Sequence, residues 1–285
     1  MIARTYMYVP GNAPDKLAKA PARGADALIV DLEDAVPQAA KEAARADVAD
    51  WLAGMGASGA GPDIWVRVNP GEAGLIDARV VTGPAVTGLC LAKAESAAGL
   101  AALDRVVTEA ETAAGLAPRT LRVMPLLESA AALLAAPEIA RAPRVARLQL
   151  GEADLAADLG VVPGPDGREL LWARSTVVAA SAAARISPPI APVSVDVRDL
   201  DLLRETTRAL SRMGFLGRAC VHPAQIPVIN EVFTPTPETV AEARGVLERY
   251  DRSLAEGSAV CLDDQGRLVD EAVVRSARRV VELAR

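Results

Sequence analysis

Short, continuously apolar runs recur along the chain and are separated by longer segments with helical periodicity. None of the runs leaves one face polar, which is typical of parallel strands that are buried on both sides. There are eight such runs, at residues 5–9, 27–32, 64–68, 88–93, 121–127, 146–150, 192–197 and 217–221. Strands that alternate with helices over about 250 residues predict an α/β fold of the TIM (β/α)8 barrel type.

Alanine-rich segments between the runs have the composition of helices. We expect helices at residues 95–114, 129–140, 172–185 and 200–213, and Asp199 has the residue type of an N-cap for the last of them. No Ser/Gly-rich linker divides this part of the chain, so we expect it to form one domain.

The chain changes character after residue 230. A Pro-rich turn leads into a helical segment, which is followed by a short hairpin-like piece and a final helical segment. We therefore expect a barrel domain at residues 1–230 and a C-terminal helical extension at residues 231–285.

Composition narrows the class of protein further. Hydrophobic residues make up 51% of the 285 residues and aromatic ones 3%, so we expect an aliphatic core. The net charge of -6 and the dispersed arginines argue against nucleic acid as a partner.

Cys90, Cys220 and Cys261 have no CxxC spacing, which favours reduced thiols and a cytoplasmic location. No apolar run approaches the roughly 18 residues of a membrane helix and no signal-peptide core is present, so we expect a soluble protein without a membrane partner.

Polar, charged or glycine residues follow nearly every predicted strand. In a barrel the carboxyl ends of the strands converge on one face, where the active sites of this fold are built. The residues are Gly11, Asn12, Asp31, Glu33, Asp34, Arg67, Asn69, Lys93, Glu95, Glu128, Glu152, Asp154, Asp196 and His222.

Glu128 and Asp154 follow the fifth and sixth predicted strands. Neighbouring strands lie about 5 Å apart, so the two carboxylates repel each other unless a cation or a proton separates them. Mg²⁺ suits such a pair, because it takes one or two carboxylates and keeps positions for water and substrate oxygens. A His-rich zinc site is excluded by the single histidine. The alternative is that these acids are helix N-caps, an interpretation that fits Glu152 and Asp158 better.

Arg67 lies between two valines inside a predicted strand. Its charge either pairs internally with Asp31 or Glu33, or points into the barrel mouth. In the second case it would bind a substrate carboxylate through two parallel hydrogen bonds. Asp31, Glu33 and Asp34 either hold metal-bound waters or cap the start of a helix.

Three further segments have weaker signals. His222 is the one histidine, and it either acts as a general base or simply ends a strand. The turn with Gly11 and Asn12 can face a phosphate through its backbone. Lys16 and Lys19 on the following helix are either solvated charges or phosphate ligands. Gly11, Asn12 and Lys16 are therefore candidate substrate-binding residues.

Taken in order and spacing, these motifs resemble the citrate lyase β-subunit-like (CitE-like) proteins of the HpcH/HpaI aldolase superfamily, which include malyl-CoA and citramalyl-CoA lyases. The resemblance covers nearly the whole chain and implies the barrel and a Mg²⁺ site. The segments that carry it read YVPGN, GADALIVDLEDAV, VRVN, KAES, PLLESA, LQLGEADLAADLG, ARS and CVHPAQI.

The resemblance also implies roles for single residues. Glu128 and Asp154 correspond to the metal-binding carboxylates. Arg67 corresponds to the arginine that holds the acid end of the substrate, and Glu33 and Asp34 correspond to the acidic stretch beneath the metal.

The tail adds one more match. The segment GRLVDEAVVRSARR looks like the C-terminal lid of the longer members. Asp270 then corresponds to a catalytic acid or base that reaches an adjoining subunit's site, which implies a homotrimer. One departure is Ala191, which stands where the family often has an acid.

The activity implied is that of a Mg²⁺-dependent C–C bond lyase, or condensing enzyme, acting on a β-hydroxyacyl-CoA such as malyl-CoA or citramalyl-CoA. Its products would be acetyl-CoA or another acyl-CoA and the oxoacid glyoxylate or pyruvate, with Arg67 and Asp270 as catalytic residues. Two alternatives stay open. One is a citrate lyase β subunit that acts on a carrier-bound citryl thioester, and the other is a non-catalytic module that binds CoA or an oxoacid.

Overall fold

The computed structural model describes residues 2–56, 61–164 and 166–284. The chain divides into two units, Ala3–Ile229 and a smaller one formed mainly by the chain from Asn230 onward. Each unit has a buried apolar cluster of its own, so the two are described separately.

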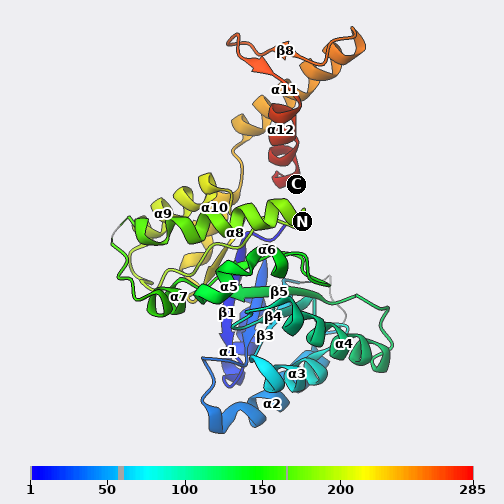
Figure 1. The fold of residues 1–285 in the computed structure, drawn as a ribbon, viewed down its shortest axis with the longest axis vertical. Helices are drawn as coiled ribbons and strands as arrows, with labels where there is room; N and C mark the ends of the chain where they lie inside the picture. The colour runs from blue at the N-terminus through cyan, green and yellow to red at the C-terminus, as the bar shows by residue number, and fades with distance from the viewer. Residues whose placement is uncertain (1, 57–60, 165, 285) are drawn as a thin grey trace. The chain divides into compact units, whose positions relative to one another are not determined.

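A parallel sheet of seven strands forms the centre of the larger unit (Figure 1). Its strands follow the order β6-β5-β4-β3-β2-β1-β7, and every pair runs parallel. The predicted α/β fold is thereby confirmed. The strands are β1 Thr5–Pro10, β2 Ala27–Asp31, β3 Asp63–Val68, β4 Gly88–Leu91, β5 Arg122–Leu127, β6 Gln149–Leu150 and β7 Arg218–Cys220.

The predicted strand at residues 192–197 is wrong. All of these residues are described, and none of them belongs to a strand. Instead, isolated bridges pair Ile190 with Gln149 of β6 and Ala191 with Arg218 of β7, which links the two edges of the curled sheet. Prolines on both sides of Ile190 and Ala191 lack the N–H that a regular ladder requires. The sheet therefore has seven regular strands, where the sequence predicts eight.

Two buried arginines hold the segment that replaces the eighth strand. Arg147 donates to the Pro188 carbonyl at 2.7 Å and also to the carbonyl of Leu216. Arg218 donates to the Pro192 carbonyl at 2.9 Å. Burial lowers the pKa of Arg218 to about 10. The guanidinium groups thus satisfy carbonyl oxygens that would otherwise be buried without a partner.

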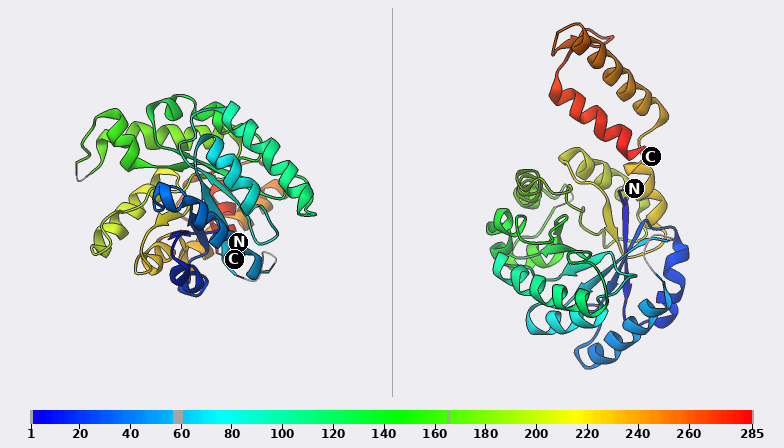
Figure 2. Two further views of the ribbon diagram at one scale, coloured as in Figure 1. Left: turned by 90° about the horizontal axis from the view of Figure 1, so that it is seen from below. Right: turned by 90° about the vertical axis from the view of Figure 1, so that its right-hand side faces the viewer.

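Helices pack around the outside of the sheet (Figure 2). Asp199 caps α9 as predicted, since its carboxylate accepts from the Leu202 N–H at 2.8 Å. The single helix predicted at residues 129–140 is instead divided at Ala135 into α5 and α6. The helices are α1 Pro14–Lys19, α2 Lys41–Gly54, α3 Gly71–Val81, α4 Ala97–Ala113, α5 Ala130–Leu134, α6 Ala136–Ile139, α7 Glu152–Leu159, α8 Leu171–Ala184, α9 Leu200–Met213 and α10 Gln225–Phe233, with 3-10 turns η1 Ala20–Arg23, η2 Gln38–Ala40 and η3 Arg168–Leu170.

Side chains from several strands fill the inside of the sheet. Tyr6, Ile29, Trp65, Cys90 and Met124 belong to one buried cluster there. These residues come from β1 to β5, so the cluster holds the strands together beneath the ends that carry the polar side chains.

The smaller unit consists of a helix, a two-stranded antiparallel hairpin and a second helix, as predicted for this part of the chain. Tyr250, Val269 and Val274 form its buried cluster. Its elements are α11 Pro237–Ala255, β8 Cys261–Leu262, β9 Leu268–Val269 and α12 Glu271–Leu283.

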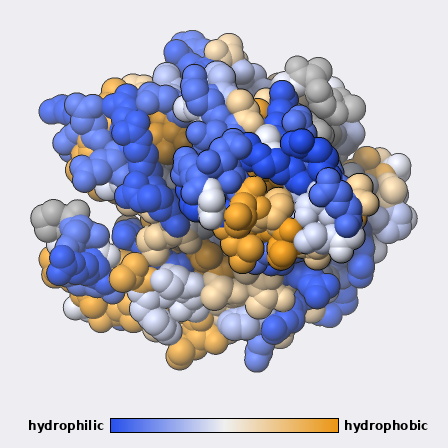
Figure 3. Space-filling model, turned by 90° about the horizontal axis from the view of Figure 1, so that it is seen from above, coloured by the Kyte–Doolittle hydropathy of each residue, from blue (hydrophilic) through white to orange (hydrophobic). Residues whose placement is uncertain are grey.

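Apolar side chains reach the surface in patches among mainly hydrophilic residues (Figure 3). In the smaller unit the exposed ones include Leu254, Val260, Leu262 and Leu268. Within the described ranges, no helix combines the length and the apolar character needed to cross a bilayer.

Candidate active site

A cavity of about 430 Å³ lies at the carboxyl ends of the central strands. Asp31, Asp34, Arg67, Glu128 and Asp154 line it together with apolar residues. The structure thus brings together side chains from β2, β3 and β5 and from the start of α7. This convergence follows from the parallel strands, whose carboxyl ends meet at one edge of the sheet.

Glu128 and Asp154 come from neighbouring parts of this edge. Glu128 directly follows β5 and is 4% exposed, whereas Asp154 lies in the first turn of α7 and is exposed. Gly151 makes room for the glutamate, because a Cβ on this glycine would lie 2.8 Å from the Glu128 Cβ and 2.9 Å from its Oε2. The absence of a side chain at Gly151 therefore decides where the Glu128 carboxylate can lie.

Burial raises the pKa of Glu128 to about 7. The backbone N–H of Lys93 donates to Glu128 Oε1 at 2.7 Å and opposes this rise, while the charges of Asp154 and Glu33 add to it. A buried carboxylate among other carboxylates gains strongly from a nearby cation.

The donor set fits Mg²⁺. Glu128 and Asp154 offer two carboxylates, and Mg²⁺ usually binds one or two carboxylates while it keeps several waters. Among the residues that the structure describes, no group of three or more His, Cys, Asp and Glu side chains could hold a metal ion. The pair therefore suits a partly hydrated ion better than a zinc ion, which takes three or four protein ligands.

Arg67 on β3 is paired with Asp31 on β2, directly across the parallel register. Its Nε and one terminal nitrogen donate to the two Asp31 oxygens at 2.7 and 2.6 Å, and the other terminal nitrogen lies 3.0 Å from Glu33 Oε2. The guanidinium also lies over the Tyr8 ring, 5.1 Å from its centroid. Burial alone would lower the pKa of Arg67, but Asp31 and Glu33 raise it. Arg67 is therefore internally paired and also lines the cavity.

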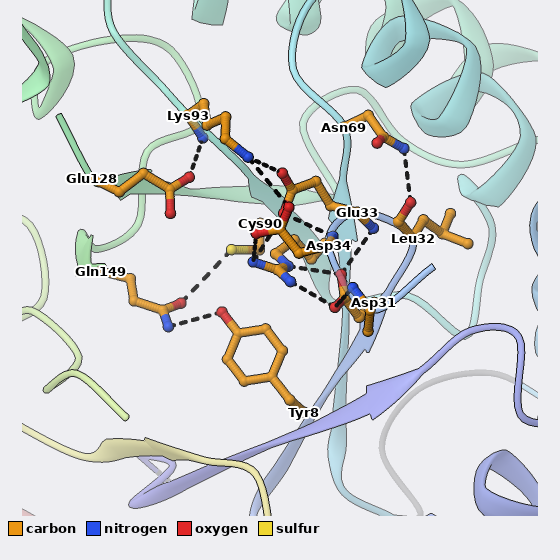
Figure 4. A network of polar contacts seen from close by, with 12 residues as sticks. Tyr8, Asp31, Leu32, Glu33, Asp34, Asn69, Cys90, Lys93, Glu128 and Gln149 are labelled. Carbon is orange, nitrogen blue, oxygen red and sulfur yellow. Dashed lines mark hydrogen bonds and ion pairs between the residues drawn. The ribbon is translucent and has the colours of Figure 1, made fainter. Parts of the chain in front are cut away.

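The acidic residues after β2 form a turn and do not begin a helix. Asp31 accepts from the N–H groups of Glu33 at 2.9 Å and Ala35 at 3.2 Å. The next helical element, η2, begins only at Gln38, so the helix-cap interpretation of these acids is wrong. On its other side the turn meets Lys93, whose ammonium contacts Glu33 and lies 3.4 Å from Asp34 (Figure 4).

Lys41 and Asn69 hold the same turn through its main chain. Asn69 is among the polar residues that follow the predicted strands, whereas Lys41 is not a candidate site residue in the sequence. Lys41 Nζ donates to the carbonyls of Leu32 at 3.0 Å and Glu33 at 2.8 Å, and to Asn69 Oδ1 at 2.6 Å. Asn69 donates to the Leu32 carbonyl at 2.9 Å and to Asp77 at 2.6 Å. Lys41 is the first residue of α2, where a cation is unfavourable to the helix dipole. The positive charge of Lys41 at the start of a helix is the signal by which the sequence could have indicated a role for this residue.

A second cavity, of about 410 Å³, is rich in basic side chains. Lys16, Lys19, Arg23 and His222 line it, and they come from α1, η1 and the turn after β7. His222 is exposed, and its Nδ1 accepts from the Ala224 N–H at 3.2 Å. Asp15 also lines this cavity, but the cations of Lys16, Lys19 and Arg23 outnumber its carboxylate, which suits an anionic group such as a phosphate.

Gly11 and Asn12 are placed differently from Lys16. Gly11 is buried, and its N–H donates to the Asp31 carbonyl at 2.8 Å. A Cβ at Gly11 would lie 2.8 Å from the same carbonyl oxygen, so this glycine lets β1 and β2 end close together. Asn12 is exposed, and neither residue is among those that line the two cavities.

The other acids have structural partners. Asp270 caps α12, where its carboxylate accepts from the N–H groups of Ala272 at 2.9 Å and Val273 at 3.1 Å. Glu152 forms a two-bond ion pair with Arg174, at 2.6 and 2.8 Å. Asp158 is a cap, though of another helix, since it accepts from the first N–H of α5 at 2.7 Å.

An acidic cavity at the carboxyl edge of a parallel sheet is the arrangement of an α/β enzyme. Comparison with known proteins agrees with this class. The HpcH/HpaI aldolase/citrate lyase family model matches residues 4–223. The chain therefore belongs to this family.

Three relatives illustrate the likeness. The chain is 32% identical to citrate lyase subunit beta of Leuconostoc mesenteroides subsp. cremoris, over 99% of this chain and 93% of that protein. It is 30% identical to L-malyl-CoA/beta-methylmalyl-CoA lyase of Cereibacter sphaeroides, over 99% and 94%. The crystal structure of the protein CitE from Mycobacterium tuberculosis in complex with magnesium, acetoacetate and coenzyme A has a TM-score of 0.77 and 30% identity, and the match covers 99% of this chain and 97% of that one.

Proposed function

We propose that this protein is a Mg²⁺-dependent C–C bond lyase, or condensing enzyme, that acts on a β-hydroxyacyl-CoA such as malyl-CoA or citramalyl-CoA. The products of cleavage are acetyl-CoA or another acyl-CoA and the oxoacid glyoxylate or pyruvate. The observation that carries the proposal is the carboxylate pair Glu128 and Asp154, which lines one cavity with Arg67. The relatives named as lyases and the magnesium in the CitE complex support it.

Glu128 and Asp154 would hold the Mg²⁺. The ion, when bound, stabilises negative charge that develops on an oxygen of the substrate. Asp31, Glu33 and Asp34 lie on the turn beside this pair and would order the water around it.

Arg67 would bind the carboxylate of the oxoacid unit. Two of its five N–H groups donate to Asp31, and its other terminal nitrogen lies 3.0 Å from Glu33 Oε2 and 3.9 Å from Asp34 Oδ2, so part of the guanidinium would remain for a further acceptor. Because Asp31 and Tyr8 fix the plane of the guanidinium, it is oriented before the substrate binds. This orientation would hold the bond to be broken in one pose.

The basic cavity would take the phosphates of the thioester carrier. Lys16 is the proposed phosphate ligand here, and Lys19 and Arg23 line the same cavity. Gly11 and Asn12 support the substrate side indirectly, through the packed turn between β1 and α1. CoA, which the CitE complex contains, carries such phosphates.

Asp270 would be the acid or base of the reaction, acting in a neighbouring subunit of a homotrimer. Cleavage leaves an electron pair on the α-carbon of the thioester, and Asp270 would supply the proton there or remove it in the condensing direction. The barrel domain of residues 1–230 would carry the metal, and residues 231–285 would serve as the lid.

A cytoplasmic location is part of the proposal. Cys90 and Cys220 are free thiols in the core and Cys261 is also unpaired, which suits a reducing compartment.

The test is an assay of the full-length protein with Mg²⁺ on malyl-CoA and citramalyl-CoA. Glu128→Gln and Asp154→Asn should each reduce kcat/KM at least about a hundredfold, because either change removes an ionic ligand. Asp158→Asn is the matched control, since it alters an acid of the same helix that only caps α5. Equal activity in the wild type and in both metal-site variants would exclude the proposed role of the pair.

The second candidate is a citrate lyase β subunit that acts on a citryl thioester of an acyl carrier. It is favoured by the 32% identity to a citrate lyase subunit beta over 99% of the chain. Cleavage of a citryl-carrier thioester, with neither CoA thioester turned over, would select this candidate.

A further inference from the structure

Lys93 adopts an unusual backbone conformation beside Glu128, shortly after the end of β4. Its φ is +48°, in the left-handed region, although it is not glycine. In this conformation its N–H donates to Glu128 Oε1 at 2.7 Å. Strained backbone that points a donor at a functional carboxylate is typical of sites that require a fixed geometry.

The side chain of the same residue reaches the opposite part of the site. Its ammonium contacts Glu33 and lies 3.4 Å from Asp34, so Lys93 spans from Glu128 to the acidic turn (Figure 4). The Lys93 side chain is 41% exposed, whereas that of Glu33 is 4% exposed. The ammonium therefore meets a buried carboxylate at one side and solvent at the other.

We propose that Lys93 is a positioning residue with two separable functions, in which its main chain orients Glu128 for the metal and its ammonium offsets the negative charge that opposes an anionic substrate. The inference rests on the proposed function and deepens it. It assigns Lys93 a role that acts through Glu128 and through the charge of the site.

The charge balance of the site supports the proposed function of the Lys93 ammonium. Carboxylates outnumber cations there, and the substrate adds further negative charge. Loss of one cation therefore strengthens the attraction for Mg²⁺ and the repulsion of an oxoacid. The cations of the site are Arg67, Lys93 and Arg174, the last paired with Glu152, and the carboxylates are those of Asp31, Glu33, Asp34, Glu128, Glu152 and Asp154.

The side-chain function is tested with Lys93→Met and Lys93→Arg in the full-length protein. Calorimetry measures Mg²⁺ binding first and then binding of pyruvate or glyoxylate to the Mg²⁺-loaded protein. In Lys93→Met the Kd for Mg²⁺ should be unchanged or lower, while the Kd for the oxoacid should rise at least about fivefold. Lys93→Arg should restore oxoacid binding to within about twofold, because it keeps the charge.

The main-chain function is tested with Lys93→Asn and Lys93→Val. Both lack the ammonium, but asparagine tolerates the left-handed conformation and a β-branched valine does not. The Kd for Mg²⁺ should therefore be at least about fivefold higher in Lys93→Val than in Lys93→Asn. Arg119 is the matched control, since it also has positive φ, at +64°, and its N–H binds the buried Glu111, at 2.9 Å. Arg119→Asn and Arg119→Val should bind Mg²⁺ equally.

Each function can be overturned by itself. Weaker Mg²⁺ binding in Lys93→Met, or an Arg variant that binds the oxoacid as poorly as the Met variant, excludes the charge function. Equal Kd values for Mg²⁺ in the Asn and Val variants exclude the main-chain function. A wild type that binds neither oxoacid also excludes the charge function. If the wild type cleaves no thioester, the proposed lyase activity fails, while the binding data still decide the role of Lys93.

Discussion

Asp31 and Arg67 lie directly opposite each other on β2 and β3 and are joined by two hydrogen bonds of 2.7 and 2.6 Å. The side chains of both are nearly buried, at 3% and 11% exposure. A pair that is fixed by strand register cannot rearrange when the substrate arrives, so the carboxylate of Asp31 determines how Arg67 faces the cavity.

Asp31→Asn should raise KM more than it lowers kcat. The change replaces one carboxylate oxygen by an amide NH₂ that repels the guanidinium, so Arg67 loses its two-bond support. We expect kcat/KM to fall at least about tenfold and Tm to fall by at least about 4 °C, as for a broken buried pair. Asp26→Asn is the control, because it breaks the more exposed Arg4 pair and should leave KM unchanged. An unaltered KM in Asp31→Asn would contradict the role of the pair.

Gly151→Ala should weaken Mg²⁺ binding. The added Cβ would lie 2.8 Å from the Glu128 Cβ, so the carboxylate must move. We expect the Kd for Mg²⁺ to rise at least about tenfold by calorimetry. Gly99→Ala is the control, because the closest contact of its Cβ would be an ordinary 3.6 Å and alanine favours the helix. Equal Kd values in both variants would show that the Glu128 carboxylate is not confined by Gly151.

Lys41→Met should loosen the acidic turn. It leaves the carbonyls of Leu32 and Glu33 and the Asn69 oxygen without the ammonium that joins them. We expect a loss of about 1–3 kcal/mol in the free energy of unfolding and lower kcat/KM, measured by urea titration and by the lyase assay. Arg79→Met removes an exposed pair with Glu109 and should change neither quantity measurably.

Acid should abolish the contribution of Glu111 to stability. Glu111 is fully buried and accepts hydrogen bonds from Arg144 at 2.7 and 2.8 Å and from the Leu121 N–H at 2.7 Å. Burial alone would raise the pKa of Glu111, but these donors lower it. A pKa that is lower in the folded state means that the ionised group stabilises the protein above the usual glutamate pKa of about 4.3.

This stabilisation should be lost as the pH falls through the lowered pKa of the folded state. The measurement is the free energy of unfolding of the wild type and of Glu111→Gln between about pH 3 and about pH 7. The difference should be largest at neutral pH and shrink toward the acid end. A difference that is independent of pH would contradict the lowered pKa.

Strand and helix positions were largely predictable because they depend on local patterns. Seven apolar runs became strands, and Asp199 caps α9. The run at residues 192–197 failed because Pro192, within the run, and the two prolines before Ile190 lack the N–H groups that a regular ladder requires, and only single bridges form, at Ile190 and Ala191.

The site was predictable only in part. The carboxyl ends of parallel strands lie at one edge of the sheet, so the sequence predicts that Glu128 and Asp154 lie there, whichever residues they contact. The pairing of Arg67 with Asp31 was one of two open alternatives, since both suit a charge inside a strand. Lys93 was placed at the site edge without a role, and Lys41 was missed, because their roles depend on contacts between segments distant in the chain.

The sequence by itself determined the α/β architecture, the edge of the sheet that carries the polar residues, and the chemistry of their side chains. It did so because hydrophobic periodicity and strand direction are local properties of the chain. Only the tertiary structure decided which charges meet. The strand register places Arg67 opposite Asp31. The left-handed backbone conformation of Lys93 points its N–H at Glu128, and the missing side chain of Gly151 leaves space for the Glu128 carboxylate. Such contacts depend on distances of a few ångströms between segments far apart in the chain, and no local pattern specifies them.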